Sequence, residues 1–105
     1  MALAKKGSRS ILVDDVQYRW KARSETDGTT HVVVELYEAP QQSVVAFFKS
    51  YPFTDPEEKR IITPGTVTAI ISHALKNSWN PEKKAKQLNL GFLDDVIKDY
   101  TYHVF

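Results

Sequence analysis

The sequence predicts an α+β fold: an antiparallel four- to five-stranded sheet, arranged as a meander, with one main helix packed across one face. Three observations predict it. Residues 16–23, VQYRWKAR, alternate between apolar and polar side chains, as expected for a strand with one face in the core and one in water. Runs rich in β-branched and aromatic residues follow after short loops, which favours a meander over crossover connections. Residues 64–78 then carry apolar side chains at helical spacing.

The first strands come after a flexible basic tail, which we assign to residues 1–8. Ile11 and Val13 lie on one face of a short strand, and Asp14-Asp15 then turns the chain. In the strand at 16–23, two sets of side chains alternate between the core and water. The core set is Val16, Tyr18, Trp20 and Ala22, and the solvent set is Gln17, Arg19, Lys21 and Arg23.

A hairpin and a third long strand follow. Asp27-Gly28 suits a turn that needs a positive φ, and its partner strand is HVVVELYE at 31–38. Along that strand the predicted core set is Val32, Val34 and Leu36, and the predicted solvent set is His31, Glu35 and Tyr37, with Val33 interrupting the alternation. A turn at 39–42 leads to a strand at 43–51, and two prolines with a cluster of charge break strand character at 52–60.

One helix is the best-defined element of the sequence. Thr63 can cap it, and Pro64 fits its first turn, where a missing N–H costs nothing. Asn80-Pro81 closes it, with Trp79 at its C-terminal end. Its apolar stripe consists of Val67, Ile70, Ile71, Ala74 and Leu75, and its polar face of Thr66, Ser72, His73, Lys76 and Asn77. A helix of about 14 residues is marginal alone, so the stripe is expected to pack on the sheet.

The rest of the chain is predicted to complete a single domain over residues 1–105. Residues 81–87 form a charged, exposed connection, and LNLGF at 88–92 returns to the sheet as a short strand. Its side chains Leu88, Leu90 and Phe92 are expected on one face. Residues 93–105 are a C-terminal extension, for which we predict a short second helix and then a terminal strand. The helical spacing is that of Leu93, Val96, Ile97 and Tyr100, and YTYHVF alternates like a strand.

Length and composition limit the class of protein. A chain of 105 residues with 42% hydrophobic and 26% charged residues is typical of one globular domain with a single core. The absence of cysteine excludes disulfides and thiolate metal sites, and it fits a reducing compartment. The N-terminus lacks the apolar stretch of a signal peptide, and no apolar run is long enough to span a bilayer. We therefore expect a soluble, cytoplasmic protein without a membrane partner.

The sequence contains no recognisable catalytic or metal-binding pattern. His73 lies off the apolar stripe near the C-terminal end of the helix, where a capping role is favoured. The positions three and four residues later hold Lys76 and Asn77 and supply no second metal ligand, and His31 and His103 lie far apart in sequence. Adjacent carboxylates point in different directions, and the four glycines form no phosphate loop. We expect a protein that acts by binding, with no catalytic residue, no metal and no cofactor.

The outer face of the sheet is the predicted binding surface. It mixes both signs of charge with a tyrosine, which suits a protein partner, or a homodimer formed through an exposed strand edge. Trp79 is expected to fold back over the sheet edge with its indole N–H on a carbonyl. Where part of Trp79 and Tyr37 stays exposed, the two rings would form an aromatic patch. The candidate binding residues are Arg19, Lys21, Arg23, Tyr37 and Trp79.

The alternative function is a small nucleic-acid-binding domain that uses the basic outer sheet face. Residues 1–23 hold six basic and two acidic residues, so the basic character is local. Three strands backed by a helix resemble the small domains of plant transcription factors and phage integrases that lay a sheet in the major groove. Against this alternative, Glu35 and Glu38 lie on the adjacent strand, and a net charge of +1 is small for a protein that binds phosphates.

The segment ITPGTVTAIISHALKNSWNPEKKAKQLNL resembles a group of short bacterial proteins that have no assigned activity. The shared features are a tyrosine–tryptophan strand, "TP", a helix of the V..II..AL type, "W.P" and a short strand. The resemblance covers residues 10–92 and implies a fold but no catalytic residue. Where such sequences favour glycine before the tryptophan, this chain has Ser78, so its helix end is expected to be built differently.

Overall fold

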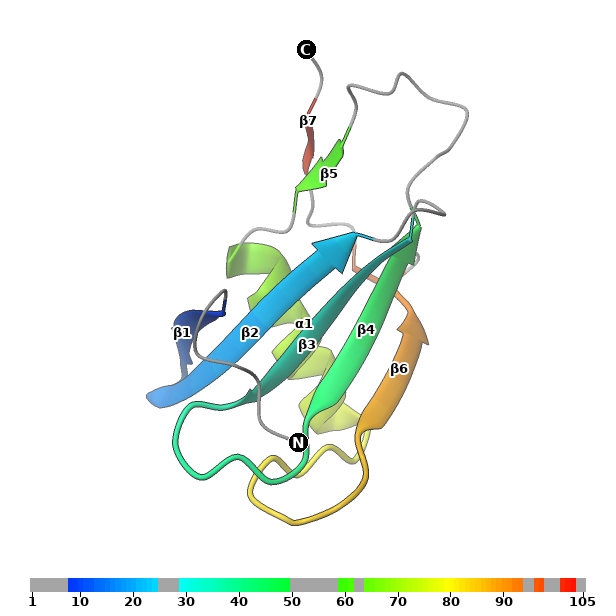
Figure 1. Cartoon of the computed structure of the whole chain (residues 1–105). Helices are drawn as coiled ribbons and strands as arrows, with labels where there is room; N and C mark the ends of the chain where they lie inside the picture. The colour runs from blue at the N-terminus through cyan, green and yellow to red at the C-terminus, as the bar shows by residue number, and fades with distance from the viewer. Residues whose placement is uncertain are drawn as a thin grey trace.

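One helix lies across one face of a five-stranded sheet in the computed structural model (Figure 1). The structure describes residues 8–24, 29–49, 59–61, 64–93, 96–97 and 101–103. The α+β class predicted from the sequence is confirmed, and within these residues no helix is long and apolar enough to cross a membrane. In chain order the elements are β1 (Arg9–Val13), β2 (Val16–Ser24), β3 (Thr29–Leu36), β4 (Val44–Lys49), β5 (Lys59–Ile61), α1 (Pro64–Lys76), β6 (Leu88–Phe92) and β7 (Thr101–His103).

The main sheet has the strand order β1-β2-β3-β4-β6 (Figure 1). The strands from β1 to β4 pair in sequence and antiparallel, as the predicted meander requires. The fifth strand corrects the prediction of an all-antiparallel sheet, because β6 runs parallel to β4. The chain passes through α1 between these two strands, and a crossover of this kind returns the chain in the same direction.

The C-terminal segment differs in part from its prediction. Leu93 and Ile97 are both buried in the core, and the Ile97 N–H donates to the Leu93 carbonyl at 2.8 Å, which closes one turn. The described residues of this segment form no second helix. The predicted terminal strand is present as β7, which pairs antiparallel with β5. β5 lies where the sequence predicts a break in strand structure, because local residue preferences do not reveal a partner far along the chain.

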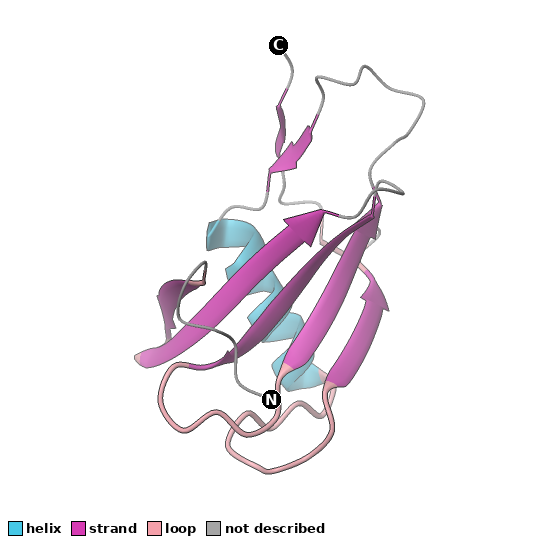
Figure 2. Ribbon diagram, in the orientation of Figure 1, coloured by secondary structure: helices cyan, strands magenta, loops and turns pink. Residues whose placement is uncertain are grey.

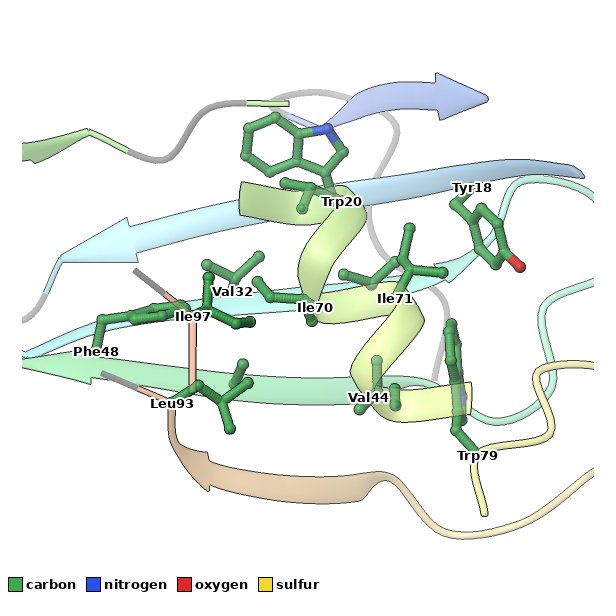
Figure 3. Packing of buried hydrophobic residues seen from close by; sticks show 14 residues of the cluster. Tyr18, Trp20, Val32, Val44, Phe48, Ile70, Ile71, Trp79, Leu93 and Ile97 are labelled. Atoms are coloured by element: carbon green, nitrogen blue, oxygen red, sulfur yellow. The ribbon is translucent and has the colours of Figure 1, made fainter. Parts of the chain in front are cut away.

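The core lies between the helix and the sheet face that bears Tyr18 and Trp20 (Figure 3). The predicted core sets of β2 and β3 are confirmed for Tyr18, Trp20, Val32 and Val34, which are buried. Val16 and Ala22, at the two ends of the β2 set, are exposed, and two members of the predicted solvent sets, Arg19 and Glu35, are buried. From the sheet, the buried side chains are Tyr18, Trp20, Val32, Val34, Val44, Ala46 and Phe48. From the helix, Val67, Ile70, Ile71 and Ala74 are fully buried.

The helix packs on the sheet with its contact face rotated from the predicted one. Leu75, which we expected in the apolar stripe, is 45% exposed. Thr66, which we expected on the polar face, is fully buried. These two residues border the stripe on opposite sides of the helix, so both exceptions follow from one small rotation toward Thr66. The predicted cap, Thr63, lies outside the described residues.

The turn between β1 and β2 contains two residues with positive φ. Val13 pairs with Val16, so Asp14 and Asp15 form a two-residue turn, with φ values of 50° and 65°. Positive φ at both central residues defines a type I′ turn, whose twist matches that of the flanking strands. The predicted turn at Asp14-Asp15 is therefore confirmed. The second predicted turn, Asp27-Gly28, lies outside the described residues.

Trp79 joins the end of the helix to the loop between β3 and β4. Its side chain is buried, and its indole Nε1–H donates to the Gln42 carbonyl at 2.9 Å, as the sequence predicts for a tryptophan at this place. Its ring centroid lies 5.8 Å from that of Tyr18 (Figure 3). The Gln42 side chain accepts a hydrogen bond from the Asn80 N–H and donates one to the Lys86 carbonyl, at 3.1 and 2.9 Å. These contacts fix the chain after the helix against the sheet.

The helix ends in a left-handed residue, as helices with a C-terminal glycine do. Ser78 has a φ of 74°, and the Trp79 N–H donates to the Ala74 carbonyl at 3.1 Å. This six-to-one hydrogen bond is typical of a Schellman motif, in which the left-handed position is usually glycine. The chain therefore keeps the geometry of a glycine cap with serine in its place, and the side chain of Ser78 makes that backbone conformation less favourable.

We expect Ser78→Gly to raise the free energy of unfolding by about 1 kcal/mol, because glycine adopts positive φ without the steric cost of a Cβ. Urea denaturation followed by circular dichroism measures the change. Ser72→Gly, at an exposed position inside α1, is the matched control and should lower the free energy of unfolding by about 0.5 kcal/mol. If Ser78→Gly instead lowered the free energy of unfolding as much as Ser72→Gly does, the left-handed backbone at Ser78 would carry no cost.

Tyr18 is expected to lower the free energy of unfolding when the pH becomes alkaline. Burial raises the pKa of its hydroxyl above the usual value, and the nearby charges of Asp14 and Glu82 raise it further. The unfolded chain therefore loses this proton at a lower pH than the folded chain, so the contribution to stability is present below about pH 10 and falls as the pH rises above it. In urea denaturation at a series of pH values from 8 upward, Tyr18→Phe should lose less stability than the wild type. Parallel curves for the two proteins would contradict this.

Candidate binding surface

The sheet face opposite α1, here called the outer face, is the surface on which the predicted binding residues lie. No helix of the described part of the chain covers this face (Figure 2). Arg19, Lys21 and Arg23 alternate with the buried Tyr18 and Trp20 along β2 and therefore point to the outer face, as the sequence predicts. Lys21 and Arg23 are exposed.

Arg19 is on the predicted face but it is not a surface charge. It is only 6% exposed, and its register partner on β3 is Glu35, which is 1% exposed. Opposite charges that face each other across two strands attract, and charged side chains are rarely buried without such a partner. The Arg19 Cζ also lies 4.6 Å from the centroid of the Tyr37 ring, in the geometry of a cation–π contact. The sequence places Arg19 and Glu35 in water, and this expectation is wrong, because both side chains are buried at opposed positions of β2 and β3.

Beside this cluster the outer face has a shallow hollow. It has a volume of about 170 Å³ and is lined by Ser8, Arg9, Ser10, Arg19 and Tyr37. Its lining is polar, with two hydroxyl groups from serine and the guanidinium of Arg19. This places Tyr37, a predicted binding residue, at the wall of the hollow.

Three aromatic side chains form a row across β3, β4 and β6 at the other end of the outer face. His31 pairs with Phe47, and Phe47 pairs with Phe92. Their ring centroids lie 6.1 and 5.7 Å apart. Arg23 extends the row onto β2, because it is the register partner of His31. We call His31, Phe47 and Phe92 the aromatic row.

Phe92 reaches the outer face through an irregularity in β6. The sequence predicts that it shares one face of the strand with Leu88 and Leu90, but it contacts Phe47 on the outer face and is 51% exposed. Gly91 has a φ of 71°, and the register between β4 and β6 shifts between Val45 and Phe47. Such a bulge turns the following side chain to the opposite face. A glycine inside a strand pattern is the sequence signal that could have indicated it.

A second row of residues borders the aromatic row. Across β2, β3, β4 and β6 it consists of Lys21, Val33, Val45 and Asn89. Val33 is the residue that interrupts the alternation in the sequence, and its side chain adds apolar area to the outer face. Together the two rows make an apolar and aromatic area with cations at its β2 end. We call this area the outer patch, formed by Lys21, Arg23, His31, Val33, Phe47 and Phe92.

Trp79 does not lie on this surface. It is buried on the inner side of the sheet against Tyr18, whereas Tyr37 lies on the outer side next to Arg19. The predicted aromatic patch of Trp79 and Tyr37 is therefore absent. The hydrogen bond of the indole to Gln42 holds the ring inside the fold, which gives Trp79 a structural role.

The described residues contain no group of three or more histidine, cysteine, aspartate or glutamate side chains that could hold a metal ion. His73 lies in the last turn of α1, where the Asn77 Nδ2 donates to its backbone carbonyl at 2.7 Å and lies 3.4 Å from its Nε2. These contacts connect His73 to the end of its own helix. That the chain is not an enzyme stays a prediction.

No family model, no curated protein and no solved structure matches this chain. The resemblance to short bacterial proteins therefore stays a prediction.

We expect a strong coupling between the two buried charges of the outer face. Glu35→Leu leaves the guanidinium of Arg19 buried without the carboxylate across the strand, which should cost about 3–5 kcal/mol of stability. The double variant Arg19→Met/Glu35→Leu removes both charges and should recover most of that loss. Urea denaturation of the two single variants and the double variant measures the coupling. Strictly additive losses would show that the two side chains do not interact.

Proposed function

We propose that this chain is a non-enzymatic binding module that binds a protein partner through the outer patch. The observation that carries the proposal is the aromatic row, in which Phe92 is 51% exposed and in contact with a second phenylalanine. Single apolar residues are common on protein surfaces, but a contiguous apolar area with polar residues around it is typical of an interaction site.

The composition of the outer patch indicates the chemistry of the partner. Phenylalanine and arginine are enriched in protein interfaces, and the energy of binding is usually concentrated in a few such residues. Here the apolar centre is Val33, Phe47 and Phe92, and the cations Lys21 and Arg23 lie at one end of it. A partner that fits would present apolar side chains next to carboxylates, because opposite charges at the rim steer the encounter.

The charge of the outer face supports a protein partner over a DNA duplex. Duplex binding needs several cations aimed at phosphates. Of the three β2 cations, Arg19 is buried opposite Glu35 and against Tyr37, so Lys21 and Arg23 are the exposed ones on that strand. Two exposed cations on one strand are few for a duplex, whereas they suffice for the rim of a protein interface.

Single-stranded nucleic acid is the second candidate, and the aromatic row is the observation that favours it. Sheets that bind single strands stack bases on aromatic side chains and place cations beside the backbone. His31, Phe47 and Phe92 offer three rings on adjacent strands, and Arg23 continues the row. This candidate uses the same patch, so a direct comparison of ligands separates the two.

Comparative affinity capture with the full-length chain tests the proposal. Wild type, Phe92→Ser and Lys21→Glu/Arg23→Glu are immobilised at equal density and incubated with a nuclease-treated extract of the source cells. We expect the recovery of at least one protein, quantified by mass spectrometry, to fall about tenfold with each variant, since each removes a central contact or reverses the rim charge. Leu75→Ser is the matched control, because Leu75 is 45% exposed on α1, away from the outer face, and its loss should leave recovery unchanged.

Two outcomes would contradict the proposal. The first is a set of captured proteins that is the same for the wild type and both outer-patch variants. The second is the absence of any variant-sensitive protein together with binding of a fluorescein-labelled oligothymidine that weakens with salt and is lost in Phe92→Ser. The second outcome would establish single-stranded nucleic acid as the ligand class.

A further inference from the structure

The strand β1 leaves one edge of the main sheet open. It is the first strand in the sheet order, and within the described residues its only partner is β2. The hairpin turn decides which backbone groups point outward. In a two-residue hairpin the residues that flank the turn, here Val13 and Val16, form a hydrogen-bonded pair, and bonded pairs then alternate along the strand. Arg9, Ile11 and Val13 therefore bond to β2, and the N–H and C=O groups of Ser10 and Leu12 point to the open edge.

This edge lacks the features that usually prevent pairing with another strand. β1 contains no proline, lysine or glycine, and its register with β2 is regular over all five residues. The opposite edge of the sheet differs, because β6 contains Gly91 at positive φ and a register shift. Leu12 on β1 is 66% exposed, and Val16 across the turn is also exposed. The apolar and regular edge of β1 is therefore the one open to another strand.

We propose that β1 pairs antiparallel with β1 of a second copy of this chain. The backbone N–H and C=O groups of Ser10 and Leu12 that point to the open edge fix the register between the two β1 strands. Only residues with such groups can form hydrogen-bonded pairs across the new contact. With the two-fold axis at Ile11, Ser10 pairs with Leu12 of the second copy and Leu12 with its Ser10. The contact is isologous, since each copy contributes the same residues.

Charge complementarity supports this register. Arg9 lies at the start of β1, and Asp14 and Asp15 lie directly after its end. In the antiparallel pair, Arg9 faces Val13 of the second copy and is next to that copy's two aspartates. The two-fold axis repeats this arrangement at the other end of the contact, so both ends join a cation with carboxylates. Opposite charges across paired strands stabilise the pair, whereas like charges would oppose it.

The contact places both outer patches on one surface. A two-fold axis perpendicular to the sheet reverses the strand direction but keeps each face on its own side, so both copies of α1 lie on one side of the joined sheet. The apolar Ile11 side chains meet on the helix side, where Ile11 already packs against the core. The contact between the two β1 strands does not depend on the partner of the outer patch, because it lies in a different part of the molecule.

Sedimentation equilibrium of the full-length chain tests the inference. From low to high micromolar concentration, the wild type should approach twice the 12.0 kDa mass of one chain. Leu12→Pro removes a backbone N–H that points to the open edge, and it removes no hydrogen bond to β2. The variant protein should therefore remain at the mass of one chain, and its circular dichroism spectrum should be unchanged. Hydrogen exchange on the wild type adds a test without substitution: the Ser10 and Leu12 amides should become protected as the concentration rises.

Charge variants separate the contact from general effects on folding. Asp14→Asn/Asp15→Gly places preferred residues in the type I′ turn, so it should raise stability while weakening the dimer about tenfold through the loss of carboxylates at both ends. Arg9→Glu should weaken the dimer at least as much without changing the backbone of β1. Phe92→Ser is the control and should leave the dimer unchanged, because Phe92 lies at the far end of the sheet order.

Three results would overturn the inference. One is a wild-type mass of a single chain at every concentration. Another is a dimer that persists in Leu12→Pro and is lost in Phe92→Ser, which would place the contact between copies at the outer patch. The third is rapid exchange of the Ser10 and Leu12 amides in a sample shown to be dimeric.

Discussion

The contact of the α1 stripe with the inner face of the sheet is the constraint on which the rest of the structure depends. Val67, Ile70, Ile71 and Ala74 are fully buried against the side of the sheet that carries Tyr18 and Trp20. A helix of this length is marginal in isolation, and a sheet needs one apolar face covered, so each element is stable because the other is present. Since side chains alternate along a strand, the same contact decides which residues of β2 form the outer face.

The outer face is organised by pairing between strands. At one end, Arg19 and Glu35 face each other and are buried, so their charges contribute to the fold more than to the surface. At the other end, the bulge at Gly91 brings Phe92 into the row with Phe47 and His31. One end is therefore polar, with its charges buried, and the other is apolar and accessible. This division leaves one apolar and accessible area on the outer face, which is separate from the edge strand β1.

Local sequence patterns were a good guide wherever one element decides its own conformation. The alternation in VQYRWKAR predicts β2, the spacing of Val67, Ile70 and Ile71 predicts α1, and Trp79 makes the hydrogen bond to a carbonyl that its position predicts. The errors concern contacts between distant elements. The parallel direction of β6, the burial of Glu35 and the outward position of Phe92 each depend on a strand that lies elsewhere in the sequence. Hydrophobic spacing alone contains no information about that strand.

The sequence by itself determined the class of the fold, its main helix α1 and the position of Arg19, Lys21 and Arg23 on one face of β2. It did so because backbone geometry converts residue spacing directly into faces, with a period of two in strands and 3.6 in helices. The tertiary structure alone decided which of those residues are accessible. Arg19 is buried opposite Glu35 and against Tyr37, whereas Lys21 and Arg23 stay exposed beside an aromatic row that three different strands form. Burial depends on neighbours brought together from different strands, and those neighbours are set by register.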